Sequence, residues 1–169
     1  MRIGLPNAKR LIRGIVKIAV ALVLSACVER PPELHYGMVD PPPIWSVRLQ
    51  AIAKDEAATE PDGRAAIAGL AMMLPGPRMS ETTVQVAVVN AIPGQQHAWH
   101  IHHGACESGG KIAGPSSEYP PLVASGSGKA GVRALLPFTV PTSGRFHIDV
   151  HASLTSTAVI ACGDLNRAH

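Results

Sequence analysis

Residues 82–103 read TTVQVAVVNAIPGQQHAWHIHH, and this stretch decides the fold class of the chain. In its first part, Thr82–Val89, apolar residues alternate with other residues and β-branched side chains dominate, which predicts a strand. Pro93 and Gly94 then turn the chain, and a second strand is expected at Ala98–His102. Strand, turn and strand in close succession are typical of an antiparallel β-protein.

The same pattern continues on both sides of this stretch. A long Gly/Ser/Pro loop covers about 104–129, and Asp55–Arg64 is expected to be a polar hairpin loop. About seven short strands at regular spacing, with no convincing helix beyond the N-terminal segment, predict an all-β antiparallel sandwich or barrel. The further strands are expected at Val47–Ala53, Ala65–Leu74, Val132–Val140, Phe146–His151 and Ala158–Cys162.

The N-terminal segment predicts export. Residues 1–17 carry five basic residues and no acid, and the apolar run Ile18–Leu24 is shorter than the roughly 20 residues that span a bilayer. A basic start, a short apolar core and small residues at the exit are typical of a secretory signal peptide, here residues 1–26. The exit LSAC ends at Cys27 and resembles the lipobox of bacterial lipoproteins, in which the cysteine is acylated and becomes the new N-terminus. An ordinary signal peptide followed by a chance cysteine is the alternative.

Behind the signal peptide, residues 27–43 are rich in proline, and we expect a lipid-attached tether ahead of one domain at 44–169. The formal charge is +3, but loss of the five basic residues leaves ten Lys and Arg against twelve Asp and Glu. Without a basic stripe, this part is not expected to bind nucleic acid. We expect an exported protein on the periplasmic side of the cell envelope, held at a membrane by its lipid anchor.

The two remaining cysteines, Cys106 and Cys162, form an even pair in an oxidising compartment, which favours a disulfide. Closing that loop would stabilise the fold by roughly 4 kcal/mol in the chain-entropy account. Cys106 also lies close in sequence to several histidines, so a role as a thiolate metal ligand is the alternative.

The histidines are clustered. His97, His100, His102 and His103 fall within seven residues, where composition alone would place about a third of one histidine. Residues i and i+2 of a strand share a face about 6.6 Å apart, so His100 and His102 are expected to converge on one metal ion. His97 and His103 have the other parity and are expected to point away unless a bulge intervenes.

A second polar group comprises His147, Asp149 and His151, which share one face of an expected strand, while Ile148 and Val150 share the other. Such a row is by itself typical of a solvent-facing surface. The His-x-His segment elsewhere in the chain weakens that interpretation and favours a metal-binding role for His151. His147 would lie about 13 Å along the strand, outside such a site. Imidazole suits copper, zinc, iron and nickel, so the histidines do not name the metal.

Three blocks of the sequence resemble the copper/zinc superoxide dismutase superfamily: HAWHIHHGAC (97–106), FHIDVHAS (146–153) and VIACGDL (159–165). The resemblance covers about residues 45–165 and implies an immunoglobulin-like Greek-key β-barrel or sandwich of about eight antiparallel strands. It implies one copper ion, and the places of three copper ligands are held here by His100, His102 and His151. It also implies a disulfide that joins Cys106 to Cys162.

The sequence departs from the superfamily in two respects. Residues 104–146 contain no histidine, and their only acidic residues are Glu107 and Glu118, so zinc is not expected at the superfamily's position. The histidine that bridges the two metals is missing for the same reason. The superfamily also has an arginine three residues before the second cysteine, where it guides superoxide to copper, and this chain has Val159 there.

The sequence therefore predicts a copper-only, superoxide dismutase-like lipoprotein whose rate is reduced by the missing arginine and bridging histidine. The alternative is a non-catalytic periplasmic protein that buffers copper or exchanges it with a donor or acceptor. A metal-free relative that uses the barrel for envelope adhesion is the third interpretation. Histidines and methionines outside the three-histidine site would serve a copper-buffering role: His97, His103, His147, Met72, Met73 and Met79.

Overall fold

The structure is a computed structural model that describes residues 42–52 and 65–168. The expected signal peptide, the tether with Cys27 and most of its proline-rich stretch, and the polar hairpin loop at Asp55–Arg64 lie outside the described residues. Within these two ranges, no helix is long and apolar enough to cross a membrane.

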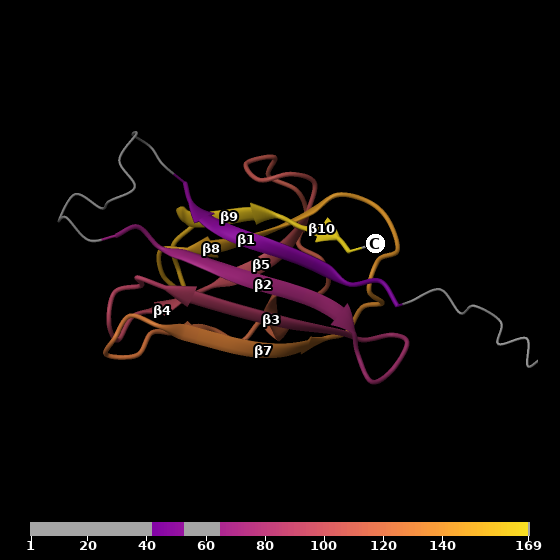
Figure 1. Cartoon of the computed structure of the whole chain (residues 1–169), viewed down its shortest axis with the longest axis horizontal. Coiled ribbons are helices and arrows are strands. Elements are labelled where there is room, and N and C mark those ends of the chain that lie inside the picture. Colours follow the sequence, from indigo (N-terminus) through magenta and orange to yellow (C-terminus); the bar gives the residue numbers. More distant parts are fainter. Residues whose placement is uncertain (1–41, 53–64, 169) are drawn as a thin grey trace, which may run out of the picture. The chain divides into compact units, whose positions relative to one another are not determined.

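The described part of the chain is nearly all β-structure, with one short 3₁₀ turn, η1 (Ser116–Glu118), and no α-helix (Figure 1). All strand pairings in it are antiparallel, which confirms the predicted fold class. The strands are β1 (Trp45–Ala51), β2 (Ala68–Pro75), β3 (Thr82–Val89), β4 (Gln96–His97), β5 (Trp99–His103), β6 (Leu122–Val123), β7 (Ala130–Leu136), β8 (Phe146–His151), β9 (Val159–Asp164) and β10 (Asn166–Arg167).

Each of the seven expected strands is present, and Thr82–Val89 and Phe146–His151 have the expected bounds. The largest error is at Val132–Val140, because the strand already ends at Leu136. Pro137 follows, and proline has no amide hydrogen with which to continue a ladder. The strands β4, β6 and β10 were not predicted, and each has only two residues.

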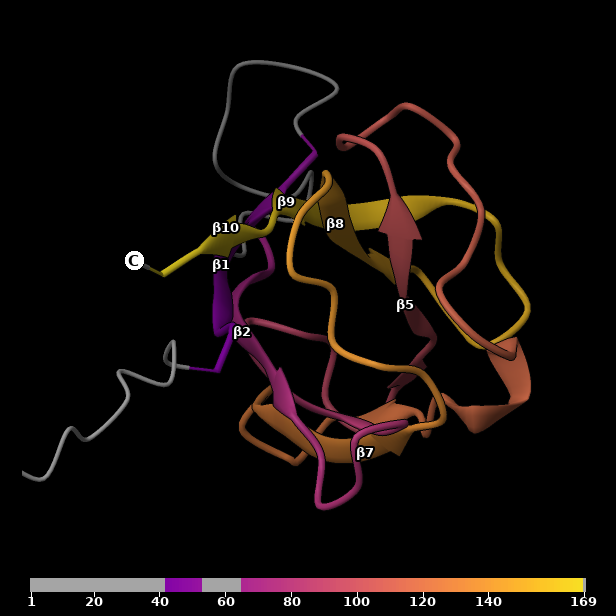
Figure 2. The same cartoon turned by 90° about the vertical axis from the view of Figure 1, so that its right-hand side faces the viewer.

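One sheet carries most of the fold. Its strand order is β5-β8-β9-β1-β2-β3-β7, β10 also pairs with β1, and β4 and β6 form a separate pair. The sheet curls into a half-barrel, with β8 and β9 above, β1 and β2 at one side and β7 below in Figure 2. Alternate side chains point inward and form the core, as in β3, where Val84, Val86 and Val88 are buried while the intervening residues are exposed.

The predicted disulfide between Cys106 and Cys162 is present, with the two Cα atoms 6.0 Å apart. It joins the start of the loop after β5 to β9, and the Cys106 amide donates a hydrogen bond of 2.8 Å to Asp164 Oδ1. Cys106 is thereby excluded as a thiolate ligand in the oxidised protein.

The long loop after β5 lies alongside that strand. Ile112 forms a β-bridge with His102, and the Ala113 amide donates to the Ile101 carbonyl at 2.8 Å. Further along, the Pro120 carbonyl accepts a hydrogen bond of 2.7 Å from the Trp99 indole nitrogen. The loop therefore runs along β5 and places its backbone beside His102.

Candidate metal centre

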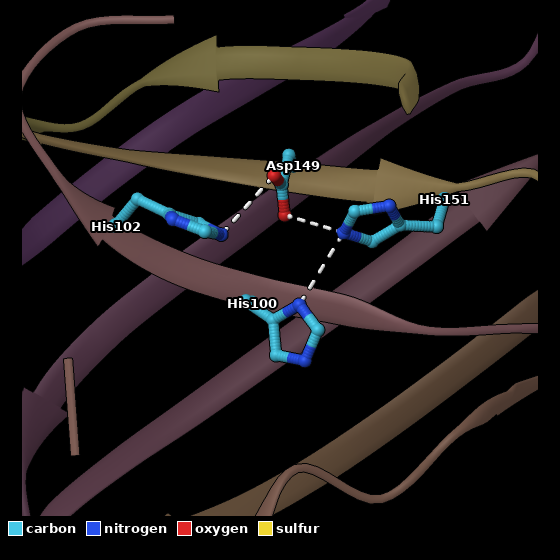
Figure 3. A group of neighbouring side chains, drawn as sticks. All are labelled: His100, His102, Asp149 and His151. Carbon is cyan, nitrogen blue, oxygen red and sulfur yellow. Dashed lines mark hydrogen bonds and ion pairs between the residues drawn. The ribbon is translucent and has the colours of Figure 1, made fainter. Parts of the chain in front are cut away.

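Four side chains converge on the β5–β8 pair: His100 and His102 from β5, and Asp149 and His151 from β8 (Figure 3). Their potential ligand atoms all lie within 4.8 Å of one another. His100 Nδ1 lies 3.3 Å from His151 Nε2, and His151 Nε2 lies 3.4 Å from Asp149 Oδ1. On the other side of the carboxylate, Asp149 Oδ2 lies 3.1 Å from His102 Nε2.

Strand register explains why these residues meet. In the antiparallel β5–β8 ladder, His100 lies opposite Asp149 and His102 lies opposite His147, so these residues share one face of the sheet. His151 is two residues beyond Asp149 and therefore lies on the same face. The β8–β9 ladder is irregular between Val150 and His151, where β8 ends. The His151 amide instead donates to the Ala98 carbonyl at 2.8 Å, which keeps the His151 ring beside His100.

The spacing of the cluster fits a metal ion. Imidazole binds zinc at about 2.0–2.1 Å, so two ligands of a tetrahedral ion lie about 3.4 Å apart. The three shortest contacts in the cluster are 3.1, 3.3 and 3.4 Å. These contacts match that separation and the other ligand atoms lie within 4.8 Å, so His100, His102 and His151 belong to one candidate metal site that also includes Asp149.

A backbone carbonyl fixes the proton on His102. His102 Nδ1 donates a hydrogen bond of 2.7 Å to the Gly110 carbonyl, which leaves Nε2 of the neutral ring as a lone-pair donor. That Nε2 faces the Asp149 carboxylate, which is also an acceptor. Both His102 Nε2 and Asp149 Oδ1 are buried and have no hydrogen-bond partner among the described residues. Two such atoms are expected where a cation binds between them.

Burial lowers the pKa of His100 below its ordinary value of 6.5. Asp149 opposes this shift, while His151 and His102 reinforce it. At neutral pH the ring of His100 is therefore uncharged, and it carries a lone pair that can bind a metal.

His97 lies outside the cluster and supports it. The side chain is only 2% exposed, and Nδ1 donates a hydrogen bond of 2.9 Å to the backbone carbonyl of His151. The backbone of His151 is thus fixed from two sides, by His97 and by the Ala98 carbonyl.

His147 and His103 also lie outside the cluster. The His147 ring stacks on that of His102, with centroids 5.2 Å apart, and its Nδ1 donates to the Gly104 carbonyl at 3.1 Å. His103 is exposed, and its ring lies against Phe146. Of the methionines considered for copper buffering, Met73 belongs to the core, whereas the other two are exposed.

Sequence reasoning missed Asp149. Its row on β8 matched a solvent-facing surface, yet Asp149 is 5% exposed and His147 is 3% exposed. Every residue of β8 from Phe146 to Val150 is buried, so the strand is covered on both faces. The available signal was an acidic residue between two histidines on one face of a strand whose other face is apolar, because a carboxylate buried there needs a partner.

Val159, at the place where the superfamily that the sequence resembles has an arginine, borders the site. Val159 lies directly opposite His151 in the β8–β9 ladder, so no side-chain charge is supplied from this position. No protein-family model matches the sequence, and a search of curated proteins gave no match either. The superfamily resemblance therefore rests on the three sequence blocks alone.

Replacing Gly110 with alanine should weaken metal binding about tenfold or more, as is typical when an outer-shell partner of a ligand is lost. A Cβ at this position would lie 1.6 Å from the His103 carbonyl oxygen, which is backbone and cannot rotate away. The loop must shift, and the Gly110 carbonyl then leaves His102 Nδ1. Competition titration of copper against a chelator measures the change.

Gly126→Ala, in the turn between β6 and β7, is the matched control, since a Cβ there meets no atom within 4 Å. Equal copper affinities for the two variants would contradict the proposed role of the Gly110 carbonyl.

Proposed function

We propose that this chain is a copper-binding, superoxide dismutase-like lipoprotein of the cell envelope that uses copper without zinc. The observation that carries the proposal is the convergence of His100, His102 and His151, which come from two of the blocks that resemble the superfamily. The antiparallel β-fold and the Cys106–Cys162 disulfide agree with the resemblance. Bound copper would supply one-electron oxidation and reduction of superoxide.

The donor set supports copper without naming it. Imidazole nitrogens bind copper, zinc, iron and nickel, and among the divalent ions copper binds most tightly to a given set of such ligands. The chain's own part is to hold these nitrogens ready. The Gly110 carbonyl sets the proton position on His102, His97 fixes the backbone of His151, and burial keeps His100 neutral.

The surroundings of the site predict slow turnover. A cation beside the metal would raise the rate at which an anion such as superoxide arrives, but Val159 lies next to His151. Asp149 adds a buried negative charge within the site. The dismutase rate should therefore be well below the diffusion limit and should depend only weakly on ionic strength.

Metal analysis followed by kinetics tests the proposal. After loading with both metals and dialysis, the oxidised domain should retain about one equivalent of copper and lose zinc, as the resemblance and the missing zinc ligands imply. Superoxide decay is then measured by pulse radiolysis across a salt series. Val159→Arg is the informative variant, because it should raise the rate at low salt and make the rate fall as salt is added.

Two outcomes would contradict this proposal. A protein that retains no copper would remove its basis. A wild-type rate near the diffusion limit that falls steeply with salt would show that another cation, such as Arg133 or Arg167, guides the anion.

The second candidate function is copper buffering or exchange with a copper donor or acceptor, without turnover. A fourth donor group in the cluster, Asp149, favours it, because a filled coordination shell holds an ion but leaves less room for a substrate. Copper that is retained at one equivalent without any superoxide decay would support this second function.

Cys27→Ser should release the protein from membranes into the soluble fraction or stall its processing. The reason is the LSAC exit after a short apolar run, which precedes a cysteine suited to acylation. Fractionation of cells that express the full chain, followed by immunoblotting, measures the effect. A mutant that is cleaved normally and still sediments with membranes would show that no lipid is attached at this residue.

A further inference from the structure

Asp149 is a buried carboxylate without an ordinary partner. Its side chain is 5% exposed, and in the described part of the chain its only ion-pair contacts are to His102 and His151. Asp149 Oδ1 accepts no hydrogen bond there. Burying an uncompensated carboxylate is strongly unfavourable, so a compensating positive charge is expected in the site.

The facing nitrogens do not compensate it when the histidines are neutral. His102 Nε2 carries a lone pair because Nδ1 donates to the Gly110 carbonyl. His151 Nε2 lies 3.4 Å from Asp149 Oδ1 and 3.3 Å from His100 Nδ1. Acceptor atoms of Asp149 and His102 thus face each other at 3.1 Å, an arrangement that a shared cation stabilises.

From these contacts we propose that Asp149 is a fourth, anionic metal ligand that makes the site hold Cu²⁺ in preference to Cu⁺. This inference rests on the proposed function, since it requires that the site binds copper. Three neutral imidazoles carry no net charge, whereas a carboxylate adds one negative charge. That charge attracts a divalent ion more strongly than a monovalent one, and burial strengthens the attraction.

Ligand chemistry points in the same direction. Carboxylate oxygens suit divalent ions, whereas Cu⁺ is selected by soft sulfur ligands such as thiolates and thioethers. Cys106 and Cys162 are joined in a disulfide, so neither offers a free thiol. Met73 lies in the core, and the exposed Met72 and Met79 lie on and just after β2, which contributes no residue to the cluster. The site therefore holds copper in its oxidised state and lowers its reduction potential.

The test compares Asp149→Asn with wild type, because asparagine keeps the shape and removes the charge. Cu²⁺ and Cu⁺ affinities are measured separately by competition with a chelator of each ion, using a reductant that contains no thiol. Cu²⁺ affinity should fall by at least about tenfold and Cu⁺ affinity by less than about threefold, judged against the usual effects of single metal-site changes. Each tenfold fall in the ratio of Cu²⁺ affinity to Cu⁺ affinity raises the reduction potential of the bound copper by about 59 mV.

Glu118→Gln is the matched control. It removes the same charge from an exposed residue of η1, and it should leave both affinities unchanged. Asp149→Val is the second variant in case Asp149→Asn does not fold. Cobalt provides an independent readout, since the visible absorption of Co²⁺ reports coordination number and should change in both Asp149 variants if the carboxylate is a ligand.

The outcomes separate this inference from the proposed function. If wild type binds copper and the ratio of Cu²⁺ to Cu⁺ affinity in both Asp149 variants stays within about twofold of the wild-type ratio, the inference is overturned. Copper binding itself is then left intact. An unchanged Co²⁺ spectrum would likewise show that the carboxylate is not a ligand. A wild-type protein that binds neither copper ion overturns both proposals.

Discussion

Replacing His102 with alanine should abolish stoichiometric copper binding, whereas replacing His147 with alanine should leave it intact. His102 Nε2 is held towards the cluster by the Gly110 carbonyl and lies 3.1 Å from Asp149. His147 lies on the same face but donates its Nδ1 hydrogen to the Gly104 carbonyl and does not belong to the cluster. Metal analysis after desalting, with the affinity measured by chelator competition, gives the result.

The two variants form a matched pair. In the wild-type protein the rings of His102 and His147 stack on each other with centroids 5.2 Å apart. Each change therefore removes one imidazole from the same part of the β5–β8 ladder. For His102→Ala the loss should exceed the roughly 10–100-fold expected for an outer-shell residue, because a ligand itself is removed. Both proteins are assayed below their unfolding temperatures, since His147 is buried and its loss should lower stability. The opposite ranking would mean that the site lies elsewhere on this face.

The strands could be predicted where their signal is local. Alternation along Thr82–Val89 and Phe146–His151 gave the bounds found in the structure. The two-residue strands could not be predicted, because two residues show no period. The pairing of Gln96–His97 with Leu122–Val123 depends on how the loop after β5 folds back, and a single strand's pattern contains no information about that.

The same distinction applies to the site. Parity within one strand was enough to bring His100 and His102 to one face, because the side-chain period of a strand is fixed. The position of Asp149 opposite His100 depends on the register between β5 and β8, which is set by tertiary packing. The Gly110 carbonyl is a backbone group, so no residue type marked it as the partner of His102. Contacts made across strands or by backbone therefore had to come from the structure.

Removing the disulfide with the double change Cys106→Ser and Cys162→Ser should lower the free energy of unfolding by roughly 4 kcal/mol, the chain-entropy value for a loop of this size. The two cysteines are 56 residues apart in sequence, and the loop that they close contains the whole of β6, β7 and β8 and most of β9. Urea denaturation of the metal-free proteins, followed by circular dichroism, measures the difference. An unchanged midpoint and slope would contradict the estimate.

The same change should also weaken copper binding, because the disulfide fixes the start of the loop that carries the Gly110 carbonyl to His102. Serine leaves no thiolate that could bind copper, so the double variant is a cleaner test than chemical reduction. An affinity loss of about tenfold or more at a temperature where the variant stays folded would place the disulfide among the groups that support the site. If stability falls while copper affinity is unchanged, the Ile112–His102 bridge suffices to hold the loop, and the disulfide acts on the fold alone.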